Sequence, residues 1–213
     1  MKTSHVFEKS KVNHALILCQ VFFWATLPAI AQTDKNVPAN QEAPGSRGQM
    51  LDGKKEGMWT YYFENGKVSA IEHFKNGALD GTVEYFYSDG VRQGIENWRK
   101  GIMEDSATYW HKNGKLDKKG KYEQGQYAGE WKHYFENGKP ERIVNYVDGL
   151  PEGNTKAFYE SGALMQDGFY KKGKEEGEWK FYGEKGDLDY IGIYREGKEI
   201  SMKPVTRKRA RKP

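Results

Sequence analysis

The sequence contains one cysteine, Cys19, and it lies within the first 31 of the 213 residues. If that segment is removed, the remaining chain has no thiol for a disulfide, for nucleophilic catalysis or for a metal. The sequence therefore excludes a disulfide scaffold and a cysteine-dependent active site for the rest of the chain. Strand pairing and side-chain packing have to hold such a fold together.

Hydrophobic residues are also scarce. They make up 37% of the chain, and the mean hydropathy is −0.92. Such a chain buries little apolar surface per residue, which argues against one large compact core. Aromatic residues nevertheless make up 14% of the chain and glycines number 25, so the chain is too aromatic to be called disordered. This combination indicates a thin, repetitive fold.

The first 31 residues form a segment distinct from the rest. Three lysines precede an apolar run over residues 15–31, which ends in the small residues Ala29 and Ala31. A charged start, an apolar run and an A-x-A end are typical of a cleavable secretory signal, so we expect cleavage between Ala31 and Gln32. A retained membrane anchor is the alternative, although the run is shorter than the roughly 20 residues of a spanning helix. The chain is therefore predicted to be exported to the periplasm, the cell surface or the medium, as part of a bacterial envelope.

The opposite end of the chain is basic. Residues 203–213 contain six lysines and arginines and no acid. Removing this +6 and the +2 of the first 31 residues from the formal net charge of +4 leaves about −4 on residues 32–202, which does not favour nucleic acid as a partner. We predict a flexible linker and a degenerate N-terminal cap over residues 32–52 and a flexible basic tail over residues 201–213. The charged residues of interest in this tail are Arg207, Lys208, Arg209, Arg211 and Lys212.

Between these ends the sequence repeats every 24 residues, without an insertion or a deletion. A first series of glycines is complete and comprises Gly53, Gly77, Gly101, Gly125, Gly149, Gly173 and Gly197. A second comprises Gly66, Gly90, Gly114, Gly138, Gly162 and Gly186. A third is interrupted once, by Asp105, and comprises Gly57, Gly81, Gly129, Gly153 and Gly177.

Two aromatic columns share this period. One column comprises Tyr62, Phe86, Trp110, Tyr134, Phe158 and Tyr182, and the other comprises Phe74, Trp98, Tyr122, Tyr146, Tyr170 and Tyr194. A fixed period of this length is the signature of a repeat architecture. The sequence therefore predicts six repeats over residues 53–200.

The interior of each repeat is typical of a β-hairpin. Short segments such as Glu-Asn-Gly divide each unit, and Asn-Gly supplies the positive φ angles that a two-residue type I′ turn requires. If Asn65-Gly66 is such a turn, Phe63 faces Val68, Tyr61 faces Ala70 and Trp59 faces Glu72. Glycines opposite the Trp59 column, such as Gly120 and Gly168, would leave room for a neighbouring ring.

These observations predict an all-β fold: an elongated, single-layer, twisted antiparallel sheet of six stacked 24-residue hairpins, with about twelve strands. We expect one better-buried face, which carries Trp59, Tyr61, Phe63, Val68 and Phe74, and one wetter face. The fragment over residues 49–53, "QMLDG", resembles the end of an earlier, degraded repeat.

The repeated unit resembles the MORN-repeat variant, a bacterial relative of the MORN repeat. The segments that carry this resemblance are "GEWKHYFENGK" from Gly129, "GEWKFYGEKGD" from Gly177 and "GMWTYYFENGK" from Gly57. The second and third units depart most, because Val83 and Ala107 stand in place of tryptophan. The resemblance implies stacked hairpins that serve as an interaction surface, and members of the variant family are often described as antitoxin-like components.

No constellation of residues points to catalysis. Outside the first 31 residues the histidines are His73, His111 and His133, and none has partners placed as in a catalytic triad. The carboxylates recur at turns, and the glycine-rich segments lack the spacing of a phosphate loop. We therefore predict no enzyme activity, no metal site and no cofactor.

The predicted function is that of an exported, non-enzymatic repeat scaffold that binds a protein partner through its curved aromatic sheet. Envelope lipid headgroups or glycans, bound with help from the basic tail, are the alternative, as is an antitoxin- or immunity-like component. The sequence predicts neither the oligomeric state nor the face that binds. The residues expected to contact the partner are Trp59, Tyr61, Tyr85, Tyr109, Trp131 and Trp179.

Overall fold

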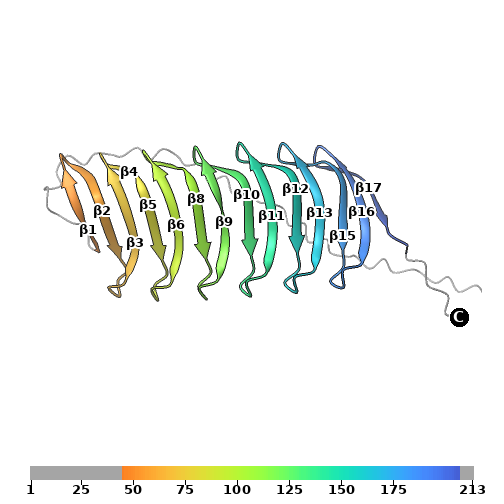
Figure 1. The fold of residues 1–213 in the computed structure, drawn as a ribbon, viewed down its shortest axis with the longest axis horizontal. Helices are drawn as coiled ribbons and strands as arrows, with labels where there is room; N and C mark the ends of the chain where they lie inside the picture. Colours follow the sequence, from red (N-terminus) through yellow and green to blue (C-terminus); the bar gives the residue numbers. More distant parts are fainter. Residues whose placement is uncertain (1–44, 207–213) are drawn as a thin grey trace, which may run out of the picture. The chain divides into compact units, whose positions relative to one another are not determined.

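A computed structural model describes residues 45–206. These residues form one open antiparallel sheet of 17 strands, with no helix among them (Figure 1). The predicted fold class, an all-β protein with a single antiparallel sheet, is confirmed. The predicted signal segment 1–31, its cleavage site at Ala31 and Gln32, the linker up to residue 44 and the basic residues 207–213 lie outside the described residues.

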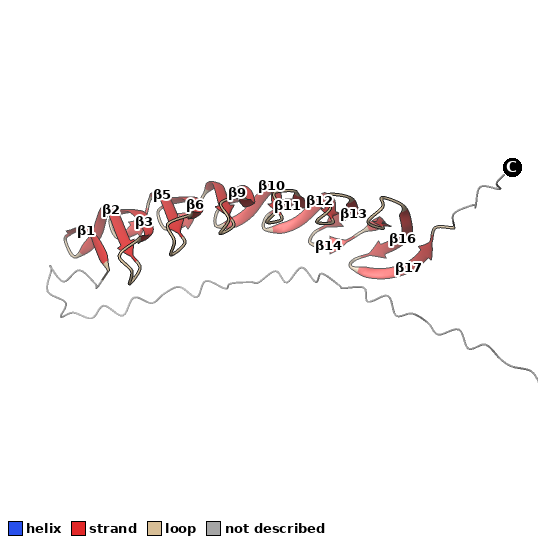
Figure 2. Ribbon diagram, turned by 90° about the horizontal axis from the view of Figure 1, so that it is seen from below, coloured by secondary structure: helices blue, strands red, loops and turns tan. Residues whose placement is uncertain are grey.

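The longer strands pair with one another in the order of the chain, and the short strands β4, β7 and β14 pair with the long strand that precedes each of them. The first nine are β1 (Ser46–Leu51), β2 (Lys54–Tyr62), β3 (Val68–Lys75), β4 (Ala78–Leu79), β5 (Gly81–Phe86), β6 (Arg92–Arg99), β7 (Ile102–Met103), β8 (Asp105–Trp110) and β9 (Leu116–Glu123). The remaining eight are β10 (Gln126–Tyr134), β11 (Pro140–Val147), β12 (Leu150–Phe158), β13 (Leu164–Lys171), β14 (Lys174–Glu175), β15 (Gly177–Tyr182), β16 (Leu188–Arg195) and β17 (Lys198–Pro204). Seen along its plane, the array is a thin band one sheet thick (Figure 2).

The sheet has more strands than the twelve expected, for two reasons. The strands β4, β7 and β14 have two residues each, and each is separated by one residue from the longer strand that follows it. In addition, β1 and β17 form the two edges. Ser46 of β1 pairs with Tyr61 just as Ala70 of β3 pairs with Tyr85, one repeat later. This register supports the interpretation of residues 49–53 as the remnant of an earlier repeat.

The Asn-Gly segments form a different turn from the one predicted. Gly66 has a φ of 79°, whereas Asn65 is not among the residues with positive φ. The Gly66 N–H donates to the Phe63 carbonyl at 2.9 Å, and the Phe63 N–H donates to the Lys67 carbonyl at 2.8 Å. The loop therefore has three residues, a β-turn followed by a left-handed glycine, and the prediction of a type I′ turn here is wrong.

The strand register is nevertheless close to the prediction. Tyr61 faces Ala70, and Trp59 faces Glu72, as expected. The predicted pairing of Phe63 with Val68 is wrong, because Val68 faces Tyr62 and the register shifts by one residue next to it. This shift compensates for the longer loop and restores the alternation of the strand body.

Type I′ turns occur at the other end of the hairpins, where the chain passes to the next repeat. Asn76 and Gly77 have φ angles of 52° and 83°, and Lys75 faces Ala78 across them. In five of these connections a carboxylate 20 residues earlier in the chain accepts a hydrogen bond from the N–H of the first turn residue, as Glu152 does from Lys172 at 2.6 Å. The other four acceptors are Glu56, Asp80, Glu104 and Glu176, at 2.7–3.2 Å. The recurring acids of the sequence therefore cap turns.

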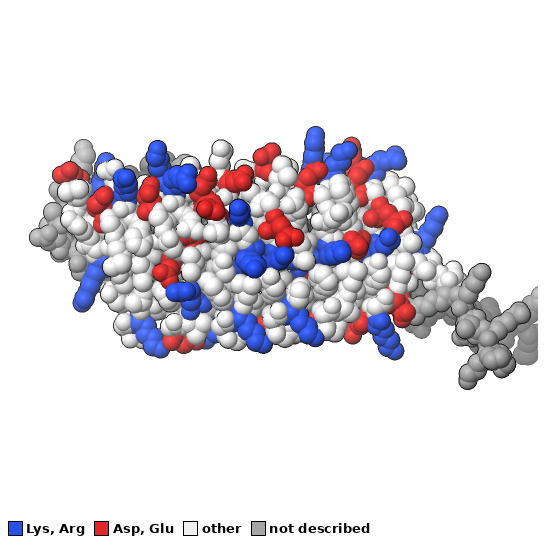
Figure 3. Space-filling model, in the orientation of Figure 1, with Lys and Arg blue, Asp and Glu red and all other residues white. Residues whose placement is uncertain are grey.

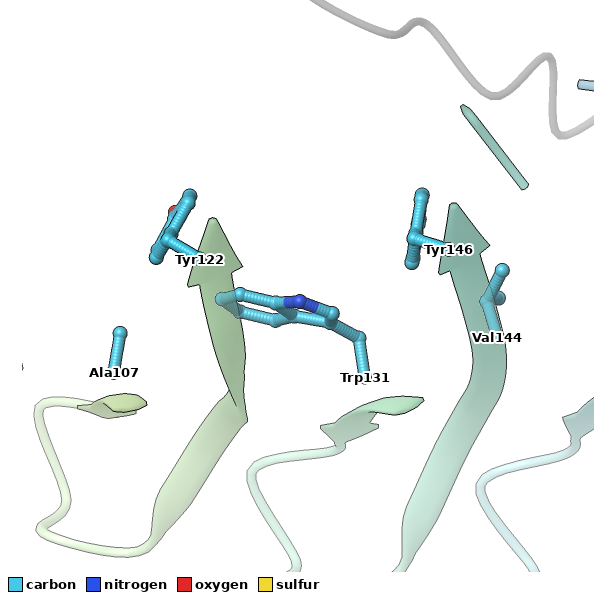
Figure 4. Close-up of a cluster of buried hydrophobic side chains, with 5 residues drawn as sticks. All are labelled: Ala107, Tyr122, Trp131, Val144 and Tyr146. Carbon is cyan, nitrogen blue, oxygen red and sulfur yellow. The ribbon is translucent and has the colours of Figure 1, made fainter. Parts of the chain in front are cut away.

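With the exception of Ala128, the buried aliphatic and aromatic side chains of the strands belong to the face that carries the Trp59 column, named here the aromatic face. The column comprises Trp59, Val83, Ala107, Trp131, Thr155 and Trp179, and all six are at most 6% exposed. Trp131 is fully buried beside Ala107, Tyr122, Val144 and Tyr146 (Figure 4). The opposite face, named the outer face, carries the Thr60 column, and Ala128 is its buried hydrophobic residue.

Each tryptophan of this column lies over a glycine of the preceding repeat. A Cβ on Gly120 would stand 2.3 Å from the Trp131 ring, and one on Gly168 would stand 2.2 Å from the Trp179 ring. The same relation joins Trp59 to Gly48. Where the column holds Val83, Ala107 or Thr155, the preceding repeat has a larger residue at this place: Glu72, Glu96 and Val144. Large and small residues therefore alternate so that each repeat fills the space left by its neighbour.

Side-chain hydrogen bonds between repeats also join the hairpin tips. Asn113 donates to the Glu136 carbonyl at 2.9 Å, and Lys115 donates to the Asn137 carbonyl at 3.0 Å. The same pair of bonds recurs two repeats before, from Asn65 and Lys67, and one repeat after, from Asn137 and Lys139. The tips are therefore held in line along the array.

Substituting Gly120→Ala will destabilise the protein by about 1–3 kcal/mol or more, because the added methyl overlaps the Trp131 ring. Chemical denaturation will measure this loss. Adding Trp131→Val to Gly120→Ala places a smaller residue in the Trp59 column opposite a residue larger than glycine. The second repeat already has such a combination, with Val83 in the column and Glu72 in the preceding repeat. The double variant should therefore lose less than the sum of the two single losses. Strict additivity would contradict the packing relation.

Substituting Ala128→Glu will stabilise the protein by about 1 kcal/mol, because Ala128 is where the series of turn-capping carboxylates is interrupted. The added carboxylate is placed to accept the N–H of Asp148, as Glu152 accepts that of Lys172. Glu152→Ala is the matched control and should lose a similar amount. A lower midpoint of urea unfolding for Ala128→Glu would contradict this role of the carboxylates.

Candidate functional site: the aromatic face

One row of side chains crosses the whole aromatic face at right angles to the strands. Pairing between successive strands places these residues side by side, one from each long strand between β1 and β16. In order, this central row comprises Ser46, Tyr61, Ala70, Tyr85, Gly94, Tyr109, Lys118, His133, Arg142, Ala157, Gln166, Phe181 and Tyr190. Since neighbouring strands lie about 4.8 Å apart, the central row forms a continuous strip of alternating size and charge.

The N-terminal half of the central row is rich in tyrosine, and the acids Glu72 and Glu96 lie beside it on the same face. The Tyr109 hydroxyl donates to Glu96 at 2.6 Å, and the indole N–H of Trp98 donates to the same carboxylate at 3.0 Å. Burial, together with Tyr122 and Glu96, raises the pKa of Tyr109 far above its ordinary value. Burial is also the largest cause that raises the pKa of Tyr61 and Tyr85. These phenols therefore stay protonated and act as hydrogen-bond donors.

The middle of the central row is cationic. Lys118 lies on β9, His133 on β10 and Arg142 on β11, and His133 faces both neighbours. The Lys118 ammonium stands 4.6 Å from the centre of the Tyr109 ring. Burial, with the charges of Arg142 and Lys118, lowers the pKa of His133 to about 4. His133 is thus neutral near pH 7.

The predicted contact residues fall into two groups in the structure. Tyr61, Tyr85 and Tyr109 are half-buried members of the central row. The three tryptophans are buried: Trp59 is 5% exposed, Trp131 is 0% exposed and Trp179 is 4% exposed. Their rings cover the glycines of the preceding repeat and are not presented to a partner, so a direct contact role is not supported for them. The contact role of the three tyrosines stays a prediction.

The histidines outside the central row have structural partners. The His73 ring lies 2.7 Å from the Thr82 carbonyl, through Nδ1, and the His111 ring lies 2.7 Å from the Tyr134 carbonyl, through Nε2. Tyr87 and Tyr159, which occupy the same column as His111, donate to the equivalent carbonyls of the next repeats. His111 is therefore part of a ladder between repeats.

The residues between 45 and 206 include no group of three or more His, Cys, Asp or Glu side chains that would hold a metal ion. A cavity of about 150 Å³ lies where Ala128 interrupts the series of capping acids. It is lined by Glu123, Gln124, Gln126, Tyr127, Ala128 and Asp148. The array therefore offers a small polar gap at a turn and a long strip on one face, and the strip is the more extensive candidate site.

The outer face has a charge pattern of its own. Basic side chains form a line across its middle, over the strands from β9 to β15, with acids beside them (Figure 3). Lys132 pairs with Glu130 at 2.9 Å, and Lys180 pairs with Glu178 at 3.3 Å. Lys119 on β9 faces Lys132 on the adjacent strand β10. The line is therefore partly neutralised by neighbouring carboxylates.

The charged residues of the central row, Lys118 and Arg142, were not among the candidates from sequence. The repeat alignment contains the signal, because Lys118 and Arg142 occupy a column that holds Ala70, Gly94 and Gln166 in other repeats. Only the register across the hairpins shows that this column adjoins the tyrosines.

The comparison with protein families is decisive for the repeat itself. The model described as "MORN repeat variant" matches residues 55–76, 128–148 and 151–172. The chain contains MORN repeat variants. Each matched segment spans one hairpin, namely β2–β3, β10–β11 and β12–β13. The units with Val83 and Ala107, which were predicted to depart most, lie outside the matched segments.

MORN repeats generally form scaffolds that bind proteins or lipids, and the family is generally non-enzymatic. No curated protein matches the chain. Among solved structures, one similar chain is that of the "GtfA/B complex bound to UDP and GlcNAc", with 17% identity over 61% of this chain. This chain spans 24% of the length of that protein, and the TM-score is 0.22. The likeness is too low to support a conclusion about function.

Lowering the pH from 7 to 4 will destabilise the MORN array by up to about 3 kcal/mol through His133. The unfolded chain binds a proton near pH 6.5 but the folded chain only near pH 4. Stability is therefore complete above about pH 6.5 and falls as the pH drops toward 4. Urea unfolding of the protein and of His133→Phe at both pH values measures the effect. An unchanged pH dependence in His133→Phe would contradict it.

Proposed function

We propose that the protein is an exported, non-enzymatic MORN-repeat scaffold that binds a protein partner through the central row of its aromatic face. The observation that carries this proposal is the continuity of the row. Thirteen side chains from successive strands lie next to one another, and they include phenols that remain donors and a cationic segment. A row of this kind presents aromatic and charged groups without an assembled catalytic group, which suits a binding surface.

The buried tryptophans support this role from beneath. They fill the space between repeats and hold the strands that carry Tyr61, Tyr85 and Tyr109 at a fixed spacing. A partner then meets a preformed surface and does not have to order it, which lowers the cost of association. Neighbouring tyrosines two strands apart lie about 10 Å from one another, which suits an extended partner that lies across the strands.

A second candidate is binding of anionic lipid headgroups or glycans. The line of lysines on the outer face favours it, since Lys119 and Lys156 are exposed there. Such binding would weaken with salt and would depend on the outer face, whereas protein binding as proposed depends on the aromatic face. Co-sedimentation with anionic liposomes, with and without residues 207–213, separates the two.

Export is tested by the N-terminal sequence of the protein recovered from cells that produce it. An N-terminus at Gln32 in the envelope or the medium supports export. An intact N-terminus in the cytosol overturns it and leaves the binding surface to be explained by a cytosolic partner.

Substituting Tyr61→Ala will weaken binding to the partner at least tenfold, because it removes an aromatic anchor from the central row. Tyr62→Ala is a matched control: it removes the adjacent tyrosine, which is also half-buried but lies on the other face. Partners are recovered by crosslinking and affinity capture with the full chain, and affinities are measured by titration. Equal losses for both variants, at equal folded fraction, would rule out the aromatic face as the binding surface.

A further inference from the structure

The cationic middle of the central row, comprising Lys118, His133 and Arg142 and named here the cationic centre, is not explained by the repeat architecture. The three residues lie on adjacent strands of one face, so their side chains emerge within about 10 Å of one another. Other repeats hold Ala70, Gly94 and Gln166 in the column of Lys118 and Arg142. The fold therefore does not need charge at this place.

The Lys118 ammonium has aromatic neighbours instead of a carboxylate. It lies 4.6 Å from the centre of the Tyr109 ring and 5.9 Å from that of the Trp131 ring. Its polar neighbour is the Tyr127 hydroxyl, at 3.5 Å. Within residues 45–206, no ion pair within 4.0 Å joins Lys118 to a carboxylate. Ring faces offset part of the charge of an ammonium but do not neutralise it.

His133 reports the electrostatic potential at this place. Its Nε2 atom is buried without a hydrogen-bond partner. Arg142 and Lys118 both act to keep the ring uncharged, in addition to burial. A potential that opposes a third positive charge is one that stabilises a negative charge. The cationic centre is thus positively charged in a partly desolvated setting.

Neither Glu72 nor Glu96 of the aromatic face forms an ion pair with Lys118. Glu96 already accepts hydrogen bonds from Tyr109 and Trp98. Glu72 lies further toward the N-terminal edge, facing Trp59. The face therefore has an acidic tyrosine segment followed by a cationic one, and an anionic group from outside fits only the second.

We propose that the cationic centre binds a carboxylate side chain of the protein partner, held by Lys118 and Arg142 between the rings of Tyr109 and Tyr127. This assignment rests on the proposed function and specifies the chemistry of that partner: an acidic residue that meets the middle of the array. Arginine and lysine together suit this group, because the guanidinium offers paired N–H donors to a carboxylate and the ammonium adds a point charge.

The site is tested on the full chain by following the ring signals of His133 in NMR spectra while N-acetyl-glutamate is added. We expect a saturable shift and a rise in the proton affinity of His133 of about tenfold, one pKa unit. Sodium chloride at equal ionic strength should cause no saturable change. A response identical to that with chloride would overturn the proposal, and so would a stronger response to sulfate than to the carboxylate.

Three variants identify the residues involved. Lys118→Gln and Arg142→Gln should each reduce the response to N-acetyl-glutamate at least fivefold. Lys156→Gln removes a lysine from the outer face and should leave the response unchanged. Thermal unfolding of each variant shows whether the fold is retained. A retained response in a folded Lys118→Gln variant would overturn the site.

Failure of this inference and failure of the proposed function give different results. If a captured partner binds the wild-type protein and Lys118→Glu equally well, the inference is wrong and the scaffold function stands. If the partner loses at least tenfold affinity for Lys118→Glu but not for Lys156→Glu, both are supported. If the chain binds the carboxylate but no partner is recovered, the site is supported and the proposed function is contradicted.

Discussion

The seating of each tryptophan ring on a glycine of the preceding repeat is the interaction on which the rest of the structure depends. A single-layer sheet has no second layer to cover its side chains, so residues on the same face have to cover one another. Trp131 achieves full burial in this way, because Gly120 has no Cβ to hold the ring away from the sheet. The contact also joins one repeat to the next, so it sets the alignment of the hairpins and thereby the straightness of the central row.

The same constraint explains why the repeats differ from one another. The repeat with Val83 in the Trp59 column follows the repeat that contains Glu72, and the repeat with Ala107 in this column follows the repeat that contains Glu96. The smaller residue leaves space that the glutamate of the neighbouring repeat occupies. Glu96 can be buried there, with 8% of its surface exposed, because Tyr109 and Trp98 donate hydrogen bonds to its carboxylate. Acidic character on the aromatic face is therefore linked to the loss of tryptophan.

The fold was predictable from the sequence because its determinants are periodic. Glycine and aromatic columns with one spacing define hairpins, and the pairing of Trp59 with Glu72 follows from counting outward from the turn. The turn type was not predictable by the same rule. Asn65-Gly66 suits a two-residue turn, yet the loop has three residues, since a compensating shift beside Val68 makes both arrangements compatible with the same strand body.

The site was less predictable, because the exposure of an aromatic ring depends on whether a neighbouring repeat covers it. Trp131 and Tyr109 look equally available in the sequence, but only the register shows that the first is covered and that the second adjoins Lys118.

The hydrogen bonds between hairpin tips have a consequence for how the chain reaches this structure. Asn113, Lys115 and His111 all reach partners 22 or 23 residues further along the chain. Such a sheet has low contact order for an all-β protein, because every strand pairs with one close to it in sequence. Folding can start at any well-packed hairpin, such as the one that contains Trp131, and spread in both directions. Among the strands of residues 45–206, the terminal strands β1 and β17 each pair on one side only, so fraying begins there while the middle of the array, with its cationic centre, stays folded.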